Sequence, residues 1–206
     1  GRVRSPEEGR RAAEVIVQES KRLGALVDTV LLFSRISRQR VTISRVATDV
    51  GALARDVVES FRPFAAAKDA TVVLDARGVD ALAVDRDVCR QILLNLLDNA
   101  VKFGPAGQTI RVGVEASSSL VTLSVGDEGP GIAREHASRI WDAFWRAPGL
   151  SEGGSGLGLS IVRELARRHG GDAIVDDRWT RGAGFVVTLS TGTPTAERDR
   201  HAVVPA

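Results

Sequence analysis

The 206-residue chain has little cysteine, lysine or aromatic content, and it has no methionine or tyrosine. Cys89 is its only cysteine, so an intrachain disulfide is excluded. It lies among Val88, Ile92 and Leu93, which favours a small core residue over a nucleophile. The 28 basic residues comprise 25 arginines and 3 lysines, are scattered along the chain, and leave a formal net charge of only +2. A solvated surface therefore explains them better than a nucleic-acid-binding patch.

Long hydrophobic runs are also absent. No apolar run approaches the ~20 residues that a membrane-spanning helix requires, and no signal peptide opens the chain. Position 1 is glycine, so we expect the sequence to be a piece of a longer protein. We expect a cytoplasmic location, with anchoring of the longer protein in an inner membrane, through segments upstream, left open. The 43% of hydrophobic residues suffices for one full domain and a smaller appendage.

The pattern of residues 11–36 predicts a long helix with a coiled-coil-like seam. Ile16, Leu23 and Val30 recur at seven-residue spacing, with a second apolar row three residues after two of them. A helix of ~25 residues is ~37 Å long and cannot bury such a seam alone. An interchain helix bundle is the favoured explanation, and packing of an ordinary amphipathic helix on the following domain is the alternative.

The remaining sequence predicts one α/β domain over residues 41–190, after a first region at 1–40 and before a disordered tail at 191–206. Alternating apolar residues predict strands, and longer amphipathic stretches predict helices. The predicted strands lie near residues 41–46, 71–75, 81–84, 109–116, 120–127, 172–177 and 184–190. The predicted helices lie near residues 49–68, 85–103 and 134–142, and a last one follows the glycines at 153–158.

A first group of polar residues interrupts the apolar helix predicted at 85–103. Asn95, Asn99 and Lys102 are spaced by four and three residues, which places them on one helix face. An amide oxygen is a hard ligand suited to Mg²⁺, and a lysine ammonium suits phosphate oxygens. The alternative is an ordinary solvated helix face, although asparagine is a poor helix former. The pattern therefore favours a site for a metal–polyphosphate group.

The second group is VGDEGPGI, at residues 125–132, where a predicted strand ends. Asp127 follows an apolar run, and Gly129 and Gly131 allow the backbone to approach a flat ligand closely. A carboxylate at this place can accept a hydrogen bond from an exocyclic amine. A turn that merely closes the strand is equally compatible with the pattern.

The third group is GGSGLGLSIVRELARRHGG, at residues 153–171, which places glycines directly before a helix. Free backbone N–H groups at a helix start form an anion site when glycines give access to them. The stretch is neither a Walker loop nor the dinucleotide fingerprint, because no Gly-Lys-Ser/Thr follows and the spacing is G-x-G-x-G. A simple hinge is the alternative.

Taken in this order, the three groups resemble the catalytic domain of sensor histidine kinases, within the wider ATPase superfamily shared with gyrase and a heat-shock chaperone. The resemblance covers about residues 11–190 and implies a two-layer α/β sandwich. The first helix resembles the second helix of the family's dimerisation and phosphotransfer hairpin. The matching motifs are the N box NLLDNAVKF (95–103), the first glycine box DEGPGI (127–132), the aromatic box IWDAFWR (140–146) and the second glycine box GSGLGL (154–159).

The resemblance implies binding of ATP with Mg²⁺. The residue matching Asn99 coordinates the metal, and the one matching Lys102 reaches the phosphates. The residue matching Asp127 binds the adenine amine, while Gly129 and Gly131 border the base. The triphosphate would be held at the helix start by Gly154, Ser155, Gly156, Leu157 and Gly158. Residues 146–154 would form a mobile lid, with Arg146 beside a phosphate.

Position 95 separates transfer from hydrolysis. Hydrolytic relatives carry a glutamate one turn before the metal-binding asparagine, where it activates water. Asn95 cannot act as such a base, so fast hydrolysis is not expected. The resemblance implies transfer of the γ-phosphoryl to a histidine, with Asn95, Asn99 and Lys102 as catalytic residues. From that histidine it would pass to an aspartate of a response regulator receiver domain. The longer protein would be a homodimer through its N-terminal helix.

The phosphoacceptor histidine is expected upstream of this chain. None of the three histidines, His136, His169 and His201, has the family's acceptor context. One further departure is RGAGF at 181–185, which lacks the usual threonine of the last glycine box.

Two alternatives stay open. The first is a stand-alone serine kinase of the anti-sigma-factor type, against which the helix at 11–36 counts. The second is a non-catalytic nucleotide-binding or docking module, against which the intact Asn99, Lys102 and Asp127 count.

Overall fold

The computed structural model describes residues 42–77, 81–148 and 155–192, together with scattered positions between 7 and 34. The chain divides into two units, Gly1–Val41 and Thr42–Ala206. Every described position of the first unit is helical. The seam residues Ile16, Leu23 and Val30 are exposed. Within the described segments, no helix combines the length and the apolar character needed to cross a bilayer.

The second unit is built on a five-stranded sheet with the order β2-β4-β5-β7-β6. β2 and β4 are parallel, and the pairs β4–β5, β5–β7 and β7–β6 are antiparallel. A separate antiparallel pair joins β1 (Val46–Asp49) to β3 (Ala81–Val84). The strands of the large sheet are β2 (Thr71–Arg77), β4 (Thr109–Ala116), β5 (Leu120–Gly126), β6 (Ala173–Val175) and β7 (Gly184–Ser190).

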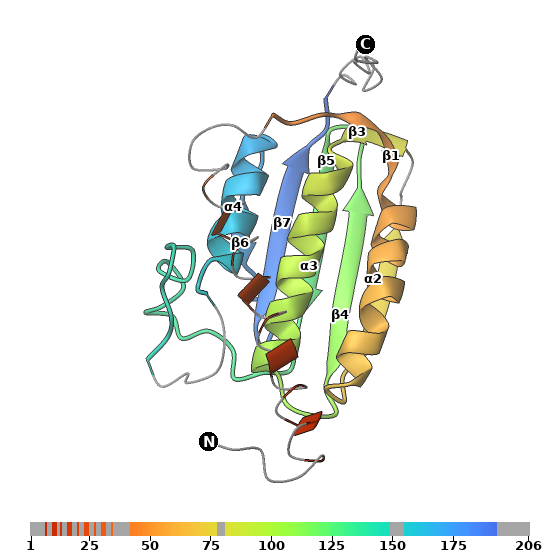
Figure 1. Ribbon diagram of the computed structural model, residues 1–206. Coiled ribbons are helices and arrows are strands. Elements are labelled where there is room, and N and C mark those ends of the chain that lie inside the picture. The colour runs from red at the N-terminus through yellow and green to blue at the C-terminus, as the bar shows by residue number, and fades with distance from the viewer. Residues whose placement is uncertain are drawn as a thin grey trace, which may run out of the picture. The chain divides into compact units, whose positions relative to one another are not determined.

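Three helices cover one face of this sheet (Figure 1). They are α2 (Val50–Ala66), α3 (Arg86–Phe103) and α4 (Gly158–Arg168), and α3 packs between the other two. Alternate strand residues face the helices and form the core. Its buried strand members are Val72, Ile110, Val112, Val114, Val121, Leu123, Val125, Ala173, Phe185, Val187 and Leu189. The two-layer α/β sandwich expected from the sequence is confirmed.

Cys89 and Trp141 belong to this core. Cys89 is fully buried, and burial raises the pKa of its thiol to about 12, so the thiolate is not available at neutral pH. Trp141 is 8% exposed and lies edge-on to Phe185, with 6.0 Å between the ring centroids. The Arg163 guanidinium covers the Trp141 ring at 5.3 Å. One part of the aromatic box is therefore a packing element.

The helices of the second unit begin in two different ways. Asp49 and Asp85 cap α2 and α3, because a carboxylate oxygen of each accepts first-turn N–H groups at 2.8 to 3.1 Å. By contrast, α4 begins at Gly158 after Leu157, whose side chain makes no capping hydrogen bond. The start of α4 therefore keeps backbone donors that the other two helices satisfy with side chains.

The strand predicted near residues 41–46 lies instead at Val46–Asp49. Residues before it make side-chain-mediated contacts rather than a ladder. The Ser44 N–H donates to Asp85 Oδ2 at 2.7 Å, and Arg45 Nη2 donates to the His169 carbonyl at 3.1 Å. Alternation of apolar residues does not distinguish such a docked segment from a paired strand.

The helix predicted near 134–142 is a succession of turns. The N–H groups of His136, Arg139 and Asp142 each donate to the carbonyl three residues earlier, as in single turns. Ring contacts hold the segment in place, because Trp145 packs on His136 at 5.2 Å between centroids. Side-chain packing replaces a continuous helical hydrogen-bond ladder here.

Candidate functional site

Asn95 and Asn99 lie where the middle of α3 meets the start of α4. A Cβ atom on Gly158 would lie 3.4 Å from Asn95 Oδ1 and 3.8 Å from Asn99 Oδ1. Asn95 Nδ2 donates to the Gln91 carbonyl at 2.8 Å, which leaves its Oδ1 for the side of Gly158. Asn99 is half-buried, and its side chain makes no hydrogen bond to any residue that the structure describes. The structure thus brings the two predicted asparagines together with the predicted anion-binding helix start.

The N-terminus of α4 presents backbone donors to this junction. The first N–H groups of a helix have no acceptor within the helix, and no side chain of a described residue caps them here. Ser155 Oγ accepts a hydrogen bond from the Leu157 N–H at 3.3 Å and shapes the approach to the helix. The positive end of the helix dipole adds to the attraction for an anion.

The loop before α4 is fixed to the aromatic box. Gly156 has φ +70°, and a Cβ there would lie 2.8 Å from the Phe144 carbonyl carbon. Phe144, itself at φ 66°, donates its N–H to the Gly156 carbonyl at 2.9 Å. Arg146, two residues after Phe144 in the chain, is exposed. Gly154 and most of the predicted lid at 146–154 lie outside the described residues.

Lys102 lies near the end of α3 and is not beside Gly158. Its ammonium forms an ion pair with Asp98, one helical turn earlier, and both side chains are more than one third exposed. Exposed pairs of this kind contribute little free energy. A phosphate oxygen could therefore replace Asp98 as the partner of the Lys102 ammonium at little cost in free energy.

Asp127 follows the end of β5 and is 3% exposed. Its Oδ1 accepts hydrogen bonds from the N–H groups of Gly129 and Ala183, both at 2.8 Å. Burial raises the pKa of this carboxyl, and the two backbone hydrogen bonds partly offset that effect. Oδ2 accepts no hydrogen bond from the described part of the chain, so it is free to accept one from a ligand.

The first glycine box packs against two other segments. A Cβ on Gly129 would lie 2.8 Å from the Phe103 carbonyl oxygen at the end of α3. Gly131 has φ +74°, and a Cβ there would lie 3.3 Å from the Gly182 carbonyl oxygen. α3 therefore connects the two parts of the site, with its middle beside Gly158 and its end beside Gly129.

Three side chains that support this region were missed by sequence reasoning: Gln108, Glu128 and Trp179. Gln108 is 2% exposed, donates from Nε2 to the carbonyl oxygen of Ala100 at 2.8 Å and accepts from the Glu128 N–H at 3.4 Å. It thereby ties the end of α3 to the first glycine box. Gly104 is the sequence signal that could have revealed it, because a Cβ there would overlap the Gln108 amide.

The described histidines are not placed as exposed acceptors. His169 is fully buried, its Nδ1 bonds the Ser190 carbonyl at 3.1 Å, and its Nε2 accepts from the Asp85 N–H at 2.9 Å. His136 is half-buried against Trp145. His201 lies outside the described residues.

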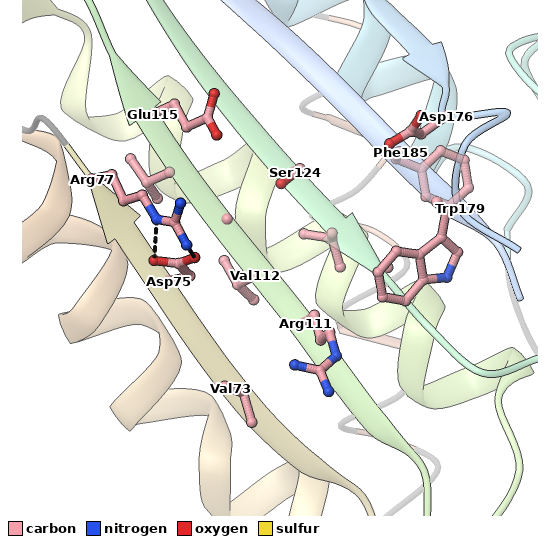
Figure 2. A pocket seen from close by; sticks show the side chains of 15 residues that line it. Val73, Asp75, Arg77, Arg111, Val112, Glu115, Ser124, Asp176, Trp179 and Phe185 are labelled. Carbon is pink, nitrogen blue, oxygen red and sulfur yellow. Dashed lines mark hydrogen bonds and ion pairs between the residues drawn. The ribbon is translucent and has the colours of Figure 1, made fainter. Parts of the chain in front are cut away.

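A separate hollow of about 250 Å³ lies on the sheet face away from the helices (Figure 2). The Arg77–Asp75 ion pair lines one end of it, and Trp179 lies at the other. None of the asparagine, lysine or aspartate side chains of the candidate site lines this hollow.

Comparison with known proteins decides the family. The family of histidine kinase-, DNA gyrase B- and HSP90-like ATPases matches residues 84–193, which is more than half of the chain. The chain belongs to this family. The matched segment contains α3, the first glycine box and α4, so all parts of the candidate site lie within it.

Sensor proteins and kinases are among the relatives of this chain. The swarming motility regulation sensor protein RssA of Serratia marcescens is 33% identical over 75% of this chain and 35% of its own length. The adaptive-response sensory kinase SasA of Synechococcus sp. (strain JA-3-3Ab) is 32% identical over 84% of this chain and 46% of its own. The chain thus spans between a third and a half of these curated relatives. Full-length ShkA, solved in complex with AMPPNP, has a TM-score of 0.78 at 31% identity, covering 93% of this chain and 40% of that one.

Proposed function

We propose that this chain binds Mg-ATP and transfers its γ-phosphoryl group to a histidine that the described residues do not supply. One observation carries the proposal: α3 connects a junction where the Asn95 and Asn99 amide oxygens lie beside Gly158 to the first glycine box, where Asp127 Oδ2 accepts no hydrogen bond from the described residues. A nucleoside triphosphate needs both kinds of contact, separated along its length. Family membership and the similarity to ShkA, solved with AMPPNP, support ATP as the ligand.

The adenine end of the proposed site is Asp127. Its Oδ2 would accept a hydrogen bond from the exocyclic amine, since Oδ1 is already held by two backbone donors. Gly129 and Gly131 would border the base, because the absence of side chains lets the backbone approach it.

The phosphate end of the proposed site is the junction of α3 and α4. The Asn99 amide oxygen accepts no hydrogen bond from the described residues and suits Mg²⁺ as a hard ligand, and phosphate oxygens and water would complete the coordination. Magnesium, when bound, neutralises charge on the phosphate oxygens. Lys102 would leave Asp98 for a phosphate oxygen, and Arg146 would lie beside another. The phosphates would rest on the backbone of Gly154, Ser155, Gly156, Leu157 and Gly158.

The residue at position 95 favours transfer over hydrolysis. Asn95 is a neutral amide whose Nδ2 is bonded to its own helix, so it cannot take a proton from water. In the transfer, the bond between the γ-phosphorus and the β–γ bridging oxygen breaks as a bond to an imidazole nitrogen forms. ADP leaves, and the imidazole N–H proton passes to solvent. Catalysis then depends on positioning and on charge stabilisation.

The proposed partners follow from the relatives and from the first unit. Ile16, Leu23 and Val30 are 65%, 52% and 46% exposed on one helix, and a second copy of that helix would cover them in a homodimer. A response regulator aspartate would be the final acceptor, as the resemblance to sensor histidine kinases implies. The longer protein would present this domain in the cytoplasm.

The proposal is tested by giving the chain γ-labelled ATP, Mg²⁺ and a separate helical hairpin that carries the acceptor histidine. We expect acid-labile label on that histidine, and no label with Asn99→Ala, which also loses Mg-dependent ATP binding. Arg86→Ala, exposed at the first residue of the same helix and far from the asparagines, should label at the native rate. Unchanged ATP affinity in Asn99→Ala would contradict the site assignment. Tight binding without transfer would favour a docking module, and label on a serine of an added protein would favour the serine-kinase alternative.

A further inference from the structure

Trp179 lies in the β6–β7 connection, on the sheet face away from the helices (Figure 2). Gly126 of β5 and Gly184 of β7 are direct register partners at the ends of their strands. A Cβ on Gly126 would lie 2.5 Å from Trp179 Cε2, and a Cβ on Gly184 would lie 2.5 Å from Trp179 Cβ. The indole therefore lies directly on a pair of glycines, and any side chain at either position would displace it.

The indole N–H reaches the backbone of Asp127. Trp179 Nε1 donates to the Asp127 carbonyl oxygen at 2.7 Å. The other hydrogen bonds of Asp127 are made with backbone groups of Gly129 and Ala183. Among the residues that the structure describes, Trp179 is therefore the one side chain that hydrogen-bonds to Asp127.

The β6–β7 connection holds Asp127 from both sides of the sheet. Side chains alternate across a strand, so the Asp127 carboxylate lies on the helix side while the indole lies opposite. Ala183 fixes Oδ1 and pairs with the Asp127 N–H at 3.0 Å, and Trp179 fixes the carbonyl. A Cβ on Gly182 would lie 2.5 Å from both the Asp127 carbonyl oxygen and Oδ1, so this connection closes tightly on the residue.

We propose that Trp179 is a positioning residue for base recognition: its indole, laid on Gly126 and Gly184, holds the Asp127 backbone so that Oδ2 is presented to the adenine amine. The inference rests on the proposed role of Asp127 and deepens it. Trp179 touches no ligand in this arrangement and acts through Asp127. This role for Trp179 also gives a function to residues 181–185, which lack the family's threonine. That segment supplies Ala183 and follows Trp179 closely in the chain.

Base recognition is tested by comparing ATP with inosine triphosphate, whose 6-oxo group offers no amine to Asp127. Trp179→Phe retains a ring over the glycines and removes the N–H donor. We expect ATP affinity to fall by about 3- to 10-fold, the effect of one hydrogen bond, and inosine triphosphate affinity to change by less than about 2-fold. Both are measured by calorimetry on the whole chain with Mg²⁺. If the phenylalanine variant does not fold, the same two affinities are measured with benzothienylalanine at position 179. This residue keeps the bicyclic shape of tryptophan but lacks the N–H.

Two further variants make each outcome decisive. Arg178→Ala removes an exposed neighbour whose side chain bonds only Asp176 among described residues, and it should change neither affinity. Asp127→Asn should abolish the preference for ATP over inosine triphosphate. If Trp179→Phe weakens both nucleotides equally, or neither, while Asp127→Asn abolishes the preference, the role of Trp179 is wrong and that of Asp127 stands. If Asp127→Asn keeps the preference, the proposed base contact fails, and the inference on Trp179 fails with it.

Discussion

Asp127 is buried where an ionised carboxylate is costly, yet the proposed base contact needs the ionised form. Burial is the larger influence and raises its pKa above the ordinary value, against two backbone N–H groups that lower it. Because the folded-state pKa is the higher one, ionised Asp127 destabilises the fold at neutral pH. That cost disappears as the pH falls through the folded-state pKa. Acid therefore favours the fold at this residue while it removes the acceptor that ATP would use.

We expect the affinity for ATP to fall as the pH is lowered, at a pH above that at which an ordinary aspartate titrates. Asp127→Asn should bind ATP more weakly at every pH and without this fall. With its oxygen on the Gly129 and Ala183 N–H groups, the asparagine would oppose the adenine amine with an NH₂ group. Dissociation constants are measured from about pH 4.5 to 7.5, around the ordinary aspartate and histidine values. The ratio of the dissociation constants of the two proteins is unaffected by titration of the nucleotide itself. A ratio that stays constant with pH would contradict the prediction.

The elements that depend on local periodicity were predictable, and those that depend on distant contacts were not. The helix predicted at 85–103 is α3, and the strand predicted at 109–116 is β4, because period and flanking turn residues are local signals. The convergence of Asn95, Asn99 and the glycine-rich helix start is a distant contact, and it was expected only because the motifs resemble those of sensor histidine kinases.

Trp179 and Gln108 could not be found in this way. The sequence features that accommodate these side chains are glycines elsewhere in the chain. Gly126 and Gly184 make room for the Trp179 indole, and Gly104 makes room for the Gln108 amide. A glycine inside a strand pattern marks close approach of some other group, but it does not say which one. The misplaced first strand has the same origin, because the contact of Ser44 with Asp85 spans 41 residues.

Gly156, just before α4, and Gly158, its first residue, allow a matched pair of alanine substitutions with different expected effects on stability. Gly156→Ala places a Cβ at φ +70° and 2.8 Å from the Phe144 backbone, so we expect the free energy of unfolding to fall by about 1–3 kcal/mol. Gly158 is helical and its Cβ would meet Asn95 Oδ1 at 3.4 Å, an ordinary contact. Gly158→Ala should therefore be neutral or stabilising by up to about 1 kcal/mol.

Both alanine variants should bind ATP more weakly. The first distorts the phosphate loop, and the second places a methyl group between the asparagine amides and the first N–H groups of α4. Urea unfolding gives the stability, and nucleotide titration gives the affinity. Native affinity in Gly158→Ala would rule out the start of α4 as the phosphate site.

At the scale of the whole domain, His169 is a junction of four segments. Its ring bonds the start of α3 through Asp85 and the end of β7 through Ser190, while its carbonyl accepts from Arg45 before β1. The ring sits at the end of α4 and is fully buried. Burial, and then the charge of Arg45, lower the pKa of the imidazole, so the domain is held together by a neutral ring.

This junction predicts that the domain loses stability in weak acid. The unfolded chain takes up the proton first because its histidine has the higher pKa, so stability is complete above that value and falls as the pH drops toward the folded-state pKa. The slope is at most about 1.4 kcal/mol per pH unit for one proton. Melting temperatures between about pH 5.5 and 7.5 should show this loss of stability in the native chain. They should show it equally in the control variant His136→Ala, which removes a half-buried histidine. His169→Gln should melt lower and with a flatter pH profile, and an unchanged profile would assign the effect elsewhere.

The place of β7 in the sheet has a consequence for synthesis of the chain on the ribosome. β7 is the last strand of the described residues, yet it lies between β5 and β6. Until residues 184–190 emerge, the nascent chain presents β5 with an open edge, which is prone to pairing with other chains. The N-box asparagines are then already made, while Ala183 and Trp179, which hold Asp127, have only just been added. The proposed nucleotide pocket therefore closes only after β7 has been made, and a chain that binds nucleotide is one whose sheet has been completed.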